Sequence, residues 1–277
     1  MDAGGLSQAR LNPKSAVCTA PLAEQEADVF SYDHLQFRYE PFPIGIAKPA
    51  IAEDLYRELV DSYPSRELFA YLPKVGHKYS LSEKYNGEAY ARFISSNAPW
   101  RELHAWIKSD DFIPAVMAAL KAHHIDLGQK PLSEAKRALK TVKNLARGRR
   151  RPLPPRLSTR FEFSMLPADG GYIMPHTDSP SKIVTLIVSM TRDGEWSPRF
   201  GGGTDVNRPR DLRLAFNRMN AQADFDAMEV LDTFEFTPNQ VVVFVKTFNS
   251  WHSVRPMTGA GSPLMRKTLT INIEAAA

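Results

Sequence analysis

The spacing of hydrophobic residues differs between the two halves of the chain. In the N-terminal half, Ile51, Leu55, Leu59 and Tyr63 recur every four positions, which places them on one face of a helix that Pro64 ends. Similar patterns predict helices over residues 98–108, 111–124 and 132–147, the first capped by Asn97 with Pro99 in its first turn. Prolines interrupt residues 30–50, so we expect only short extended pieces there.

Alternation of polar and apolar residues replaces helical spacing in the C-terminal half. Residues 266–273 place Leu269 and Ile271 on one side of a strand and Arg266 and Thr268 on the other. Other strands are predicted over residues 156–165, 182–190, 228–236 and 241–245, with a turn at 239–240. Several short strands separated by glycine and proline turns are typical of a sandwich or barrel.

These patterns predict a mainly β protein with helices, of the α+β class. We expect a flexible tail over residues 1–28 and an N-terminal helical support region over 29–155. A double-stranded β-helix core, that is, a jelly roll of the cupin-like type, should occupy residues 156–277. The support region and the core are expected to form one integrated domain, which a chain of 277 residues is long enough to build.

One segment of the chain is strongly basic. The net charge of +4 is concentrated in residues 136–156, which hold nine Lys or Arg and no acid, so the rest of the chain is mildly acidic. A basic segment of this kind also occurs at phosphate or nucleic-acid contacts, which is the alternative. No aromatic residue interrupts the segment to stack bases, so we favour a solvated helix end and expect no nucleic-acid partner.

The remaining composition constrains the cellular context. Cys18 is the single cysteine, which excludes an intrachain disulfide and a cysteine-rich metal site. No apolar run approaches the ~20 residues that span a bilayer, and the first residues lack the pattern of a signal peptide. We therefore expect a cytoplasmic protein without a membrane partner; the sequence does not indicate its oligomeric state.

Three residues offer the ligands of an iron site. His176 and Asp178 are two positions apart, so on a strand their side chains point the same way, and one metal ion can take both. His252 follows a later apolar strand and can supply the third ligand. Two imidazoles and one carboxylate, with other positions open, are the ligand set of non-haem Fe(II) oxygenases. The alternative is that His176 caps a loop and His252 is a core histidine.

Arg266 adds an independent constraint. It lies on the last predicted strand with Thr268 on the same face. A buried guanidinium needs an anionic partner, and its planar group can donate two parallel hydrogen bonds to a carboxylate. A nearby hydroxyl can donate a further hydrogen bond to the same carboxylate. This pair suits the distal carboxylate of 2-oxoglutarate. The alternative is a surface arginine on an edge strand.

The C-terminal half resembles the 2-oxoglutarate/Fe(II)-dependent oxygenase superfamily, especially its prolyl-4-hydroxylase-like branch. The resemblance covers about residues 157–274 and rests on five segments: 165–172 with His176-Thr177-Asp178, Glu195-Trp196, 201–204, 237–244 and 252–256. It implies a jelly roll, Fe(II) on His176, Asp178 and His252, and 2-oxoglutarate on Arg266 and Thr268. Met165 stands where many relatives have a tyrosine, and Arg266 replaces the lysine common in the prolyl hydroxylase branch, so peptidyl-proline specificity is not implied.

The resemblance implies a dioxygenase that uses O2 to hydroxylate or desaturate an unactivated C–H bond, with succinate and CO2 as coproducts. We expect a small-molecule substrate; a protein or peptide hydroxylase and a non-catalytic metal or ligand sensor are the alternatives. Residues expected to shape the substrate pocket are Arg160, Tyr172, Trp251 and Arg255. The segment 205–226 is expected to be either a lid over the site, which we favour, or a solvated insertion.

Overall fold

Two β-sheets face each other in the computed structural model, which describes residues 29–32, 34–128, 134–147, 156–217 and 220–275. The eight-stranded major sheet has the order β1-β2-β10-β7-β12-β5-β4-β3, and the minor sheet has the order β6-β11-β8-β9. The strands are β1 (Gln36–Arg38), β2 (Ile44–Ala47), β3 (Ala70–Leu72), β4 (Lys78–Ser82), β5 (Leu157–Pro167), β6 (Ile173–His176), β7 (Lys182–Ser189), β8 (Thr204–Pro209), β9 (Met228–Phe234), β10 (Val241–Val245), β11 (His252–Val254) and β12 (Met265–Ala275).

The C-terminal strands wind back and forth between the two sheets. β5, β7, β10 and β12 lie in the major sheet, whereas β6, β8, β9 and β11, which connect them along the chain, lie in the minor sheet. Neighbouring strands of this group pair in antiparallel fashion. This alternation is the jelly roll predicted from the sequence, and the predicted fold class is confirmed.

The N-terminal half contributes strands as well as helices. Strands β1 and β2 lie where short extended pieces were expected, whereas β3 and β4 were not predicted. β2 pairs with β10 and β4 pairs with β5, so strands from residues 36–82 extend the major sheet at both edges. The helices are α1 (Glu53–Asp61), α2 (Gly87–Ser96), α3 (Ala98–Ile107), α4 (Phe112–Ala122) and α5 (Glu134–Ala146). Four of them match predicted helices, and α2 was missed.

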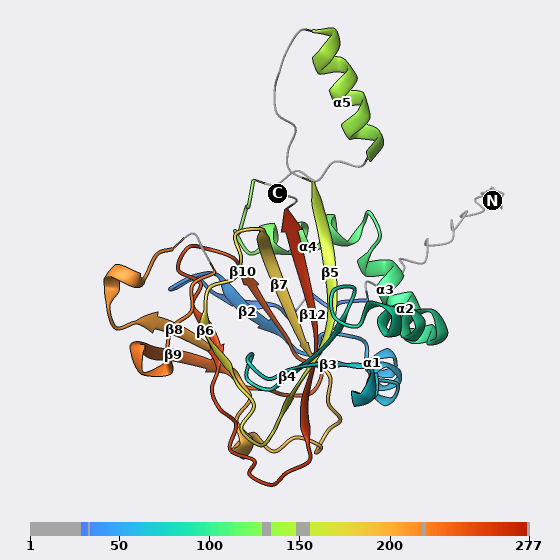
Figure 1. Ribbon diagram of the computed structural model, residues 1–277. Helices are drawn as coiled ribbons and strands as arrows, with labels where there is room; N and C mark the ends of the chain where they lie inside the picture. The colour runs from blue at the N-terminus through green and yellow to red at the C-terminus, as the bar shows by residue number, and fades with distance from the viewer. Residues whose placement is uncertain (1–28, 33, 129–133, 148–155, 218–219, 276–277) are drawn as a thin grey trace, which may run out of the picture.

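The helices α1–α4 cover one side of the major sheet, opposite the minor sheet (Figure 1). Phe161 and Phe163 of β5 and Leu269 and Ile271 of β12 point to the helices and are completely buried. Trp100 of α3 packs edge-to-face on Phe163, with ring centroids 4.7 Å apart. Side chains alternate along a strand, so the residues of β5 and β12 between these positions face the interior of the jelly roll. Several of them are polar and can take part in a functional site.

Asn239 connects the two halves at the turn between β9 and β10. Its φ of 52° is left-handed, and its side chain is almost completely buried. The Asn239 Oδ1 accepts hydrogen bonds from the backbone N–H groups of Ala50 and Ile51, and its Nδ2 donates to the Ile51 carbonyl and the Glu53 carboxylate. One amide thus fixes the start of α1 on the jelly roll.

The helix α5 stands apart from the rest of the molecule (Figure 1). Its Leu139, Val142 and Leu145 are 70%, 63% and 75% exposed, and neither they nor any other α5 residue belongs to a hydrophobic core cluster among the described residues.

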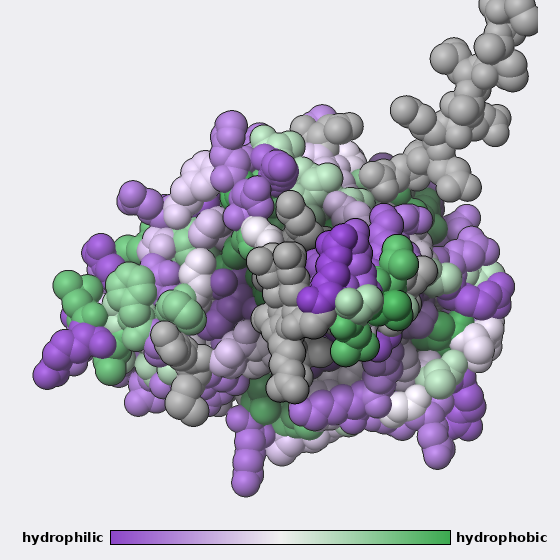
Figure 2. Space-filling view, turned by 90° about the horizontal axis from the view of Figure 1, so that it is seen from above, coloured by the Kyte–Doolittle hydropathy of each residue, from purple (hydrophilic) through white to green (hydrophobic). Residues whose placement is uncertain are grey.

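The view from above shows a mostly hydrophilic surface with small groups of hydrophobic side chains among the polar ones (Figure 2). The predicted tail 1–28 and part of the basic segment, residues 148–155, lie outside the described residues. Over the part of the chain that is described, no helix has the length and apolar character needed to cross a bilayer.

Candidate metal centre

Two histidines face each other across neighbouring strands of the minor sheet. His176 ends β6 and His252 begins β11, and the antiparallel register pairs these two residues directly. Their ring centroids are 4.2 Å apart. Side chains at directly opposed positions of an antiparallel pair lie on the same face of the sheet. The strand register therefore brings together two imidazoles that are 76 residues apart in the chain.

Hydrogen bonds to the backbone set the orientation of both rings. The Nδ1 of His176 lies 2.9 Å from the Met174 carbonyl oxygen, and the Nδ1 of His252 lies 2.9 Å from the Ser250 carbonyl oxygen. A carbonyl can only accept, so each Nδ1 carries the proton. The Nε2 atoms are consequently left with a free lone pair, which is the form in which imidazole binds a metal.

Asp178 completes the group from the loop after β6. It is 3% exposed, and its Oδ1 lies 3.7 Å from His176 Nε2 and 2.5 Å from the Nζ of Lys182. The Thr185 hydroxyl lies 3.3 Å from the other carboxylate oxygen. Burial alone would raise the pKa of Asp178, but His176, Lys182 and His252 together hold it well below its usual range. The carboxylate is therefore ionised, and Lys182 and Thr185 hold one oxygen each.

The donor set fits a divalent metal ion. His176, Asp178 and His252 each offer one ligand atom, and these atoms lie within 4.8 Å of one another. Metal–ligand bonds of about 2.0–2.3 Å need only small side-chain rotations to close around a common ion from this distance. The set has two nitrogen ligands and one oxygen ligand, which is the composition that non-haem Fe(II) uses.

Arg266 and Thr268 lie in the same small inner cavity as these three residues. The cavity has a volume of about 120 Å³, and its apolar lining includes Leu166, Ile187 and Phe244. Arg266 is 6% exposed, and no carboxylate of the described residues lies within ion-pair distance of its guanidinium. Burial lowers the pKa of Arg266 to about 10, so it stays charged at neutral pH.

Packing holds the Arg266 side chain in place without neutralising it. Its Nε donates to the Gly202 carbonyl, and its guanidinium lies 4.7 Å from the Phe236 ring centroid. A Cβ on Gly202, whose φ is +87°, would come within 3.2 Å of the Arg266 side chain. Burial of a cation that no carboxylate neutralises is costly, so a side chain in this state favours the binding of an anion. Met165 points away from this cavity, into the helical core.

The buried imidazole of His252 makes the stability of the metal-free protein depend on pH. Burial lowers the pKa of His252 to about 3, and His176 adds to this effect. Between pH 6.5 and 3 the unfolded chain therefore binds a proton that the folded chain does not, so stability is lost as the pH falls through this window. With a chelator present, this group should lower the unfolding free energy by about 2 kcal/mol between pH 8 and pH 5.

Urea unfolding of the wild type and of His252→Asn at the two pH values would measure this contribution. Other groups also titrate in this range, so the informative quantity is the difference between the two proteins. We expect the variant to lose about 2 kcal/mol less than the wild type on acidification. Equal losses in both proteins would contradict the assignment of a neutral buried His252.

A larger outer cavity lies on the other side of His176 and Asp178. Its volume is about 580 Å³, and Arg160, one of the four residues expected to shape a substrate pocket, lines it. The other three, Tyr172, Trp251 and Arg255, line neither cavity. The Trp251 ring is buried and donates to the Ala215 carbonyl, the Tyr172 ring packs on Phe225, and Arg255 pairs with Asp205.

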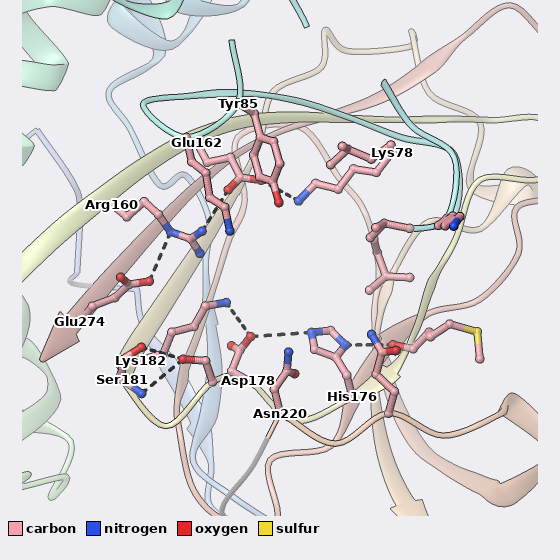
Figure 3. Close-up of a pocket in the computed structure, with 18 residues that line it drawn as sticks. Lys78, Tyr85, Arg160, Glu162, His176, Asp178, Ser181, Lys182, Asn220 and Glu274 are labelled. Carbon is pink, nitrogen blue, oxygen red and sulfur yellow. Dashed lines mark hydrogen bonds and ion pairs between the residues drawn. The ribbon is translucent and has the colours of Figure 1, made fainter. Parts of the chain in front are cut away.

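The outer cavity also contains residues that the sequence analysis did not single out. Lys182 contacts Asp178, and Lys78 forms an ion pair with the buried Glu162 of β5, with 2.6 Å between the charged atoms. Figure 3 shows Lys78, Glu162 and Arg160 across the cavity from His176 and Asp178. One signal was available: Arg160 and Glu162 share the face of β5 opposite Phe161 and Phe163, so this face had to meet something polar.

The segment 205–226 divides into two parts. Residues 204–209 form β8 in the middle of the minor sheet, so they are not a lid. Further along, Asn220 and Gln222 line the outer cavity. The backbone of residues 221–223 is hydrogen-bonded to that of residues 175–177. Among the described residues of this segment, the second part is the one that borders the outer cavity.

Comparison with known proteins gives matches among structures only. No protein-family model and no curated protein matches the chain by sequence. The fold is similar to a prolyl-4-hydroxylase from Pseudomonas putida (14% identity, 84% of this chain, 92% of that chain, TM-score 0.42). It is also similar to the non-heme alpha-ketoglutarate-dependent epimerase SnoN from nogalamycin biosynthesis (10%, 84%, 76%, TM-score 0.45). A third match is HygX from Streptomyces hygroscopicus with nickel, 2-oxoglutarate and hygromycin B bound (9%, 88%, 85%, TM-score 0.40). At these identities and TM-scores, the assignment of the site depends on the residues of this chain.

Proposed function

We propose that this protein is a 2-oxoglutarate- and Fe(II)-dependent dioxygenase that hydroxylates or desaturates an unactivated C–H bond of a small molecule. The observation that carries the proposal is the position of the His176, Asp178 and His252 group. It lies between an inner cavity that contains the buried Arg266 and an outer cavity with room for a second molecule. An oxygenase of this class needs a cosubstrate site and a substrate site on either side of one metal.

The side chains of the inner cavity would bind the metal and the cosubstrate. His176, Asp178 and His252 would hold Fe(II), and Arg266 with Thr268 would bind the distal carboxylate of 2-oxoglutarate. Bound Fe(II), 2-oxoglutarate and O2 would together supply the oxidising power that no side chain here offers, yielding succinate and CO2. The apolar side chains Leu166, Ile187 and Phe244 would keep bulk water out of the inner cavity.

The size of the outer cavity favours a small molecule over a peptide. Pockets of about 300–1,000 Å³ are typical of small-molecule sites, and the volume of about 580 Å³ falls within this range. A hydroxylated peptide, recognised by mass spectrometry as a gain of one oxygen atom in a treated cell extract, would instead support the protein hydroxylase alternative.

Turnover without an added substrate tests the enzyme class directly. In aerobic buffer with Fe(II), the protein should slowly convert 2-oxoglutarate to succinate, because oxygenases of this class decarboxylate the keto acid even when uncoupled. Succinate is measured by mass spectrometry, with the Ni(II)-loaded protein as the control. Succinate formation no faster than in this control would contradict the enzyme and favour a sensor that binds without turnover.

A further inference from the structure

The wall of the outer cavity carries more positive than negative charge. Its basic residues are Lys74, Lys78, Lys84, Arg160 and Lys182, and its acidic residues are Glu162, Asp178 and Glu274. These side chains surround the open space from several sides, and the labelled ones point into it or border it (Figure 3). A cleft with one predominant charge concentrates ligands of the opposite charge.

Two of the basic residues are already neutralised by the acidic ones. Glu162 is 3% exposed; its carboxylate lies 2.6 Å from Lys78 Nζ and 3.5 Å from Arg160 Nη1, and it accepts a hydrogen bond from Ser80. The Nε of Arg160 lies 3.2 Å from the Glu274 carboxylate. Lys78, Arg160, Glu162 and Glu274 therefore form one network in which positive and negative charges balance.

Three lysines remain outside this balanced network. Lys74 and Lys84 have no carboxylate within ion-pair distance among the described residues; Lys84 contacts only the Tyr85 ring as a cation–π pair. Lys182 has Asp178 as its only acidic partner in the described part of the chain.

Loading of the metal centre increases the excess of positive charge. If the proposed function is right, Asp178 becomes a metal ligand, and its charge no longer neutralises Lys182. The charges of the divalent metal, Asp178, the 2-oxoglutarate dianion and Arg266 add to zero. Lys74, Lys84 and Lys182 are then left facing the outer cavity without compensation, and an empty cavity of this kind attracts anions.

We propose that the substrate of this enzyme is an oxyanion, that is, a molecule with a carboxylate, phosphate or sulfate group, and that Lys74 and Lys84 bind this group. Both lysines are exposed and line the cavity, Lys74 before β4 and Lys84 after it. Tyr85, the residue next to Lys84, lies across the cavity from His176 and Asp178 (Figure 3). An anionic group held at Lys84 would leave the uncharged part of the substrate to extend toward the metal, with Lys74 on the other flank of the cavity. Lys182, beside Asp178, adds to the positive potential that draws the molecule in. The inference rests on the proposed function and adds the substrate class to it.

Two probes of the same shape and different charge test the inference. Benzenesulfonate is an oxyanion, and benzenesulfonamide is its neutral counterpart. Binding of each is measured calorimetrically to the protein loaded with Ni(II) and 2-oxoglutarate, which does not turn over. We expect the sulfonate to bind about tenfold more tightly than the sulfonamide, and this preference should decrease with added salt.

Charge-matched variants locate the binding site. Lys74→Met/Lys84→Met should remove the preference, whereas Lys121→Met/Lys140→Met, on α4 and α5 and outside the cavity, should keep it. No preference in the wild type, including no binding of either probe, would overturn the inference. A preference that survives in Lys74→Met/Lys84→Met would also overturn it, because the sulfonate would then bind elsewhere.

The same samples separate this inference from the proposed function. Uptake of Ni(II) and 2-oxoglutarate is titrated before the probes are added. A protein that takes up both and shows no sulfonate preference contradicts only the substrate class. A protein that takes up neither contradicts the proposed function, whatever the probes do.

Discussion

Replacing His176 with alanine should abolish succinate formation and weaken Fe(II) binding by at least about 100-fold. Only His252 and Asp178 would remain as protein ligands, and the strand register offers no replacement, since His176 is the residue directly opposite His252. The effect should be specific to the site. The His176 side chain is 18% exposed and belongs to no hydrophobic core cluster, so its loss should leave folding intact.

Anaerobic titration with Fe(II) measures the affinity, and mass spectrometry measures succinate. His34→Ala is the matched control, because His34 is exposed and lines neither cavity. It should retain both metal binding and turnover. Full turnover in His176→Ala would refute the iron assignment, even if the variant were less stable than the wild type.

Replacing Arg266 with methionine should raise the KM for 2-oxoglutarate by about 100-fold and leave Fe(II) affinity nearly unchanged. Removing one partner of a buried, hydrogen-bonded charge pair costs about 2–5 kcal/mol, which corresponds to about 30-fold to several thousand-fold in affinity, and 100-fold lies within this range. The metal ligands would keep their own partners, because none of the hydrogen bonds to His176, His252 or Asp178 involves Arg266.

The same variant should be more stable than the wild type in the absence of cosubstrate. In the wild type, the buried guanidinium of Arg266 has no acidic partner among the described residues. An apolar side chain of similar length therefore removes an uncompensated charge. Added 2-oxoglutarate should stabilise the wild type and have little effect on the variant, since stabilisation follows binding to the folded state. Thermal unfolding of both proteins with and without 2-oxoglutarate measures the higher stability of the variant and the stabilisation of the wild type by the cosubstrate. An unchanged KM would contradict the role of Arg266, and a lower stability would contradict the account of its buried charge.

The candidate metal ligands were the part of the site that the sequence indicated most clearly. A His-x-Asp on a strand and a later histidine after an apolar strand are compatible with few kinds of site. What sequence could not supply was the register that pairs His176 with His252, because pairing between distant strands depends on the whole sheet. The face of β12 was also predicted correctly, since Arg266 and Thr268 alternate with buried Leu269 and Ile271.

The wider site was predicted less well. Trp251 was chosen because it precedes His252, but neighbours on a strand point to opposite faces, and its ring packs on the Ala215 side. Lys182 was overlooked because it begins an apolar strand. Its spacing of four residues from Asp178 would predict a contact on a helix, but residues 179–181 form a loop that brings the two together. Strands β1–β4 have at most five residues each and are interrupted by prolines and turns, so their pattern is too short to be read.

The flanking strands β2 and β4 restrict how the gene can be shortened. Residues 156–277 hold every candidate ligand, so they invite expression as a minimal catalytic fragment. Such a fragment would leave the outer backbone groups of β10 and β5 without partners, and unpaired strand edges promote fibril-like association. A truncation series aimed at crystals or screening therefore has to start before residue 36.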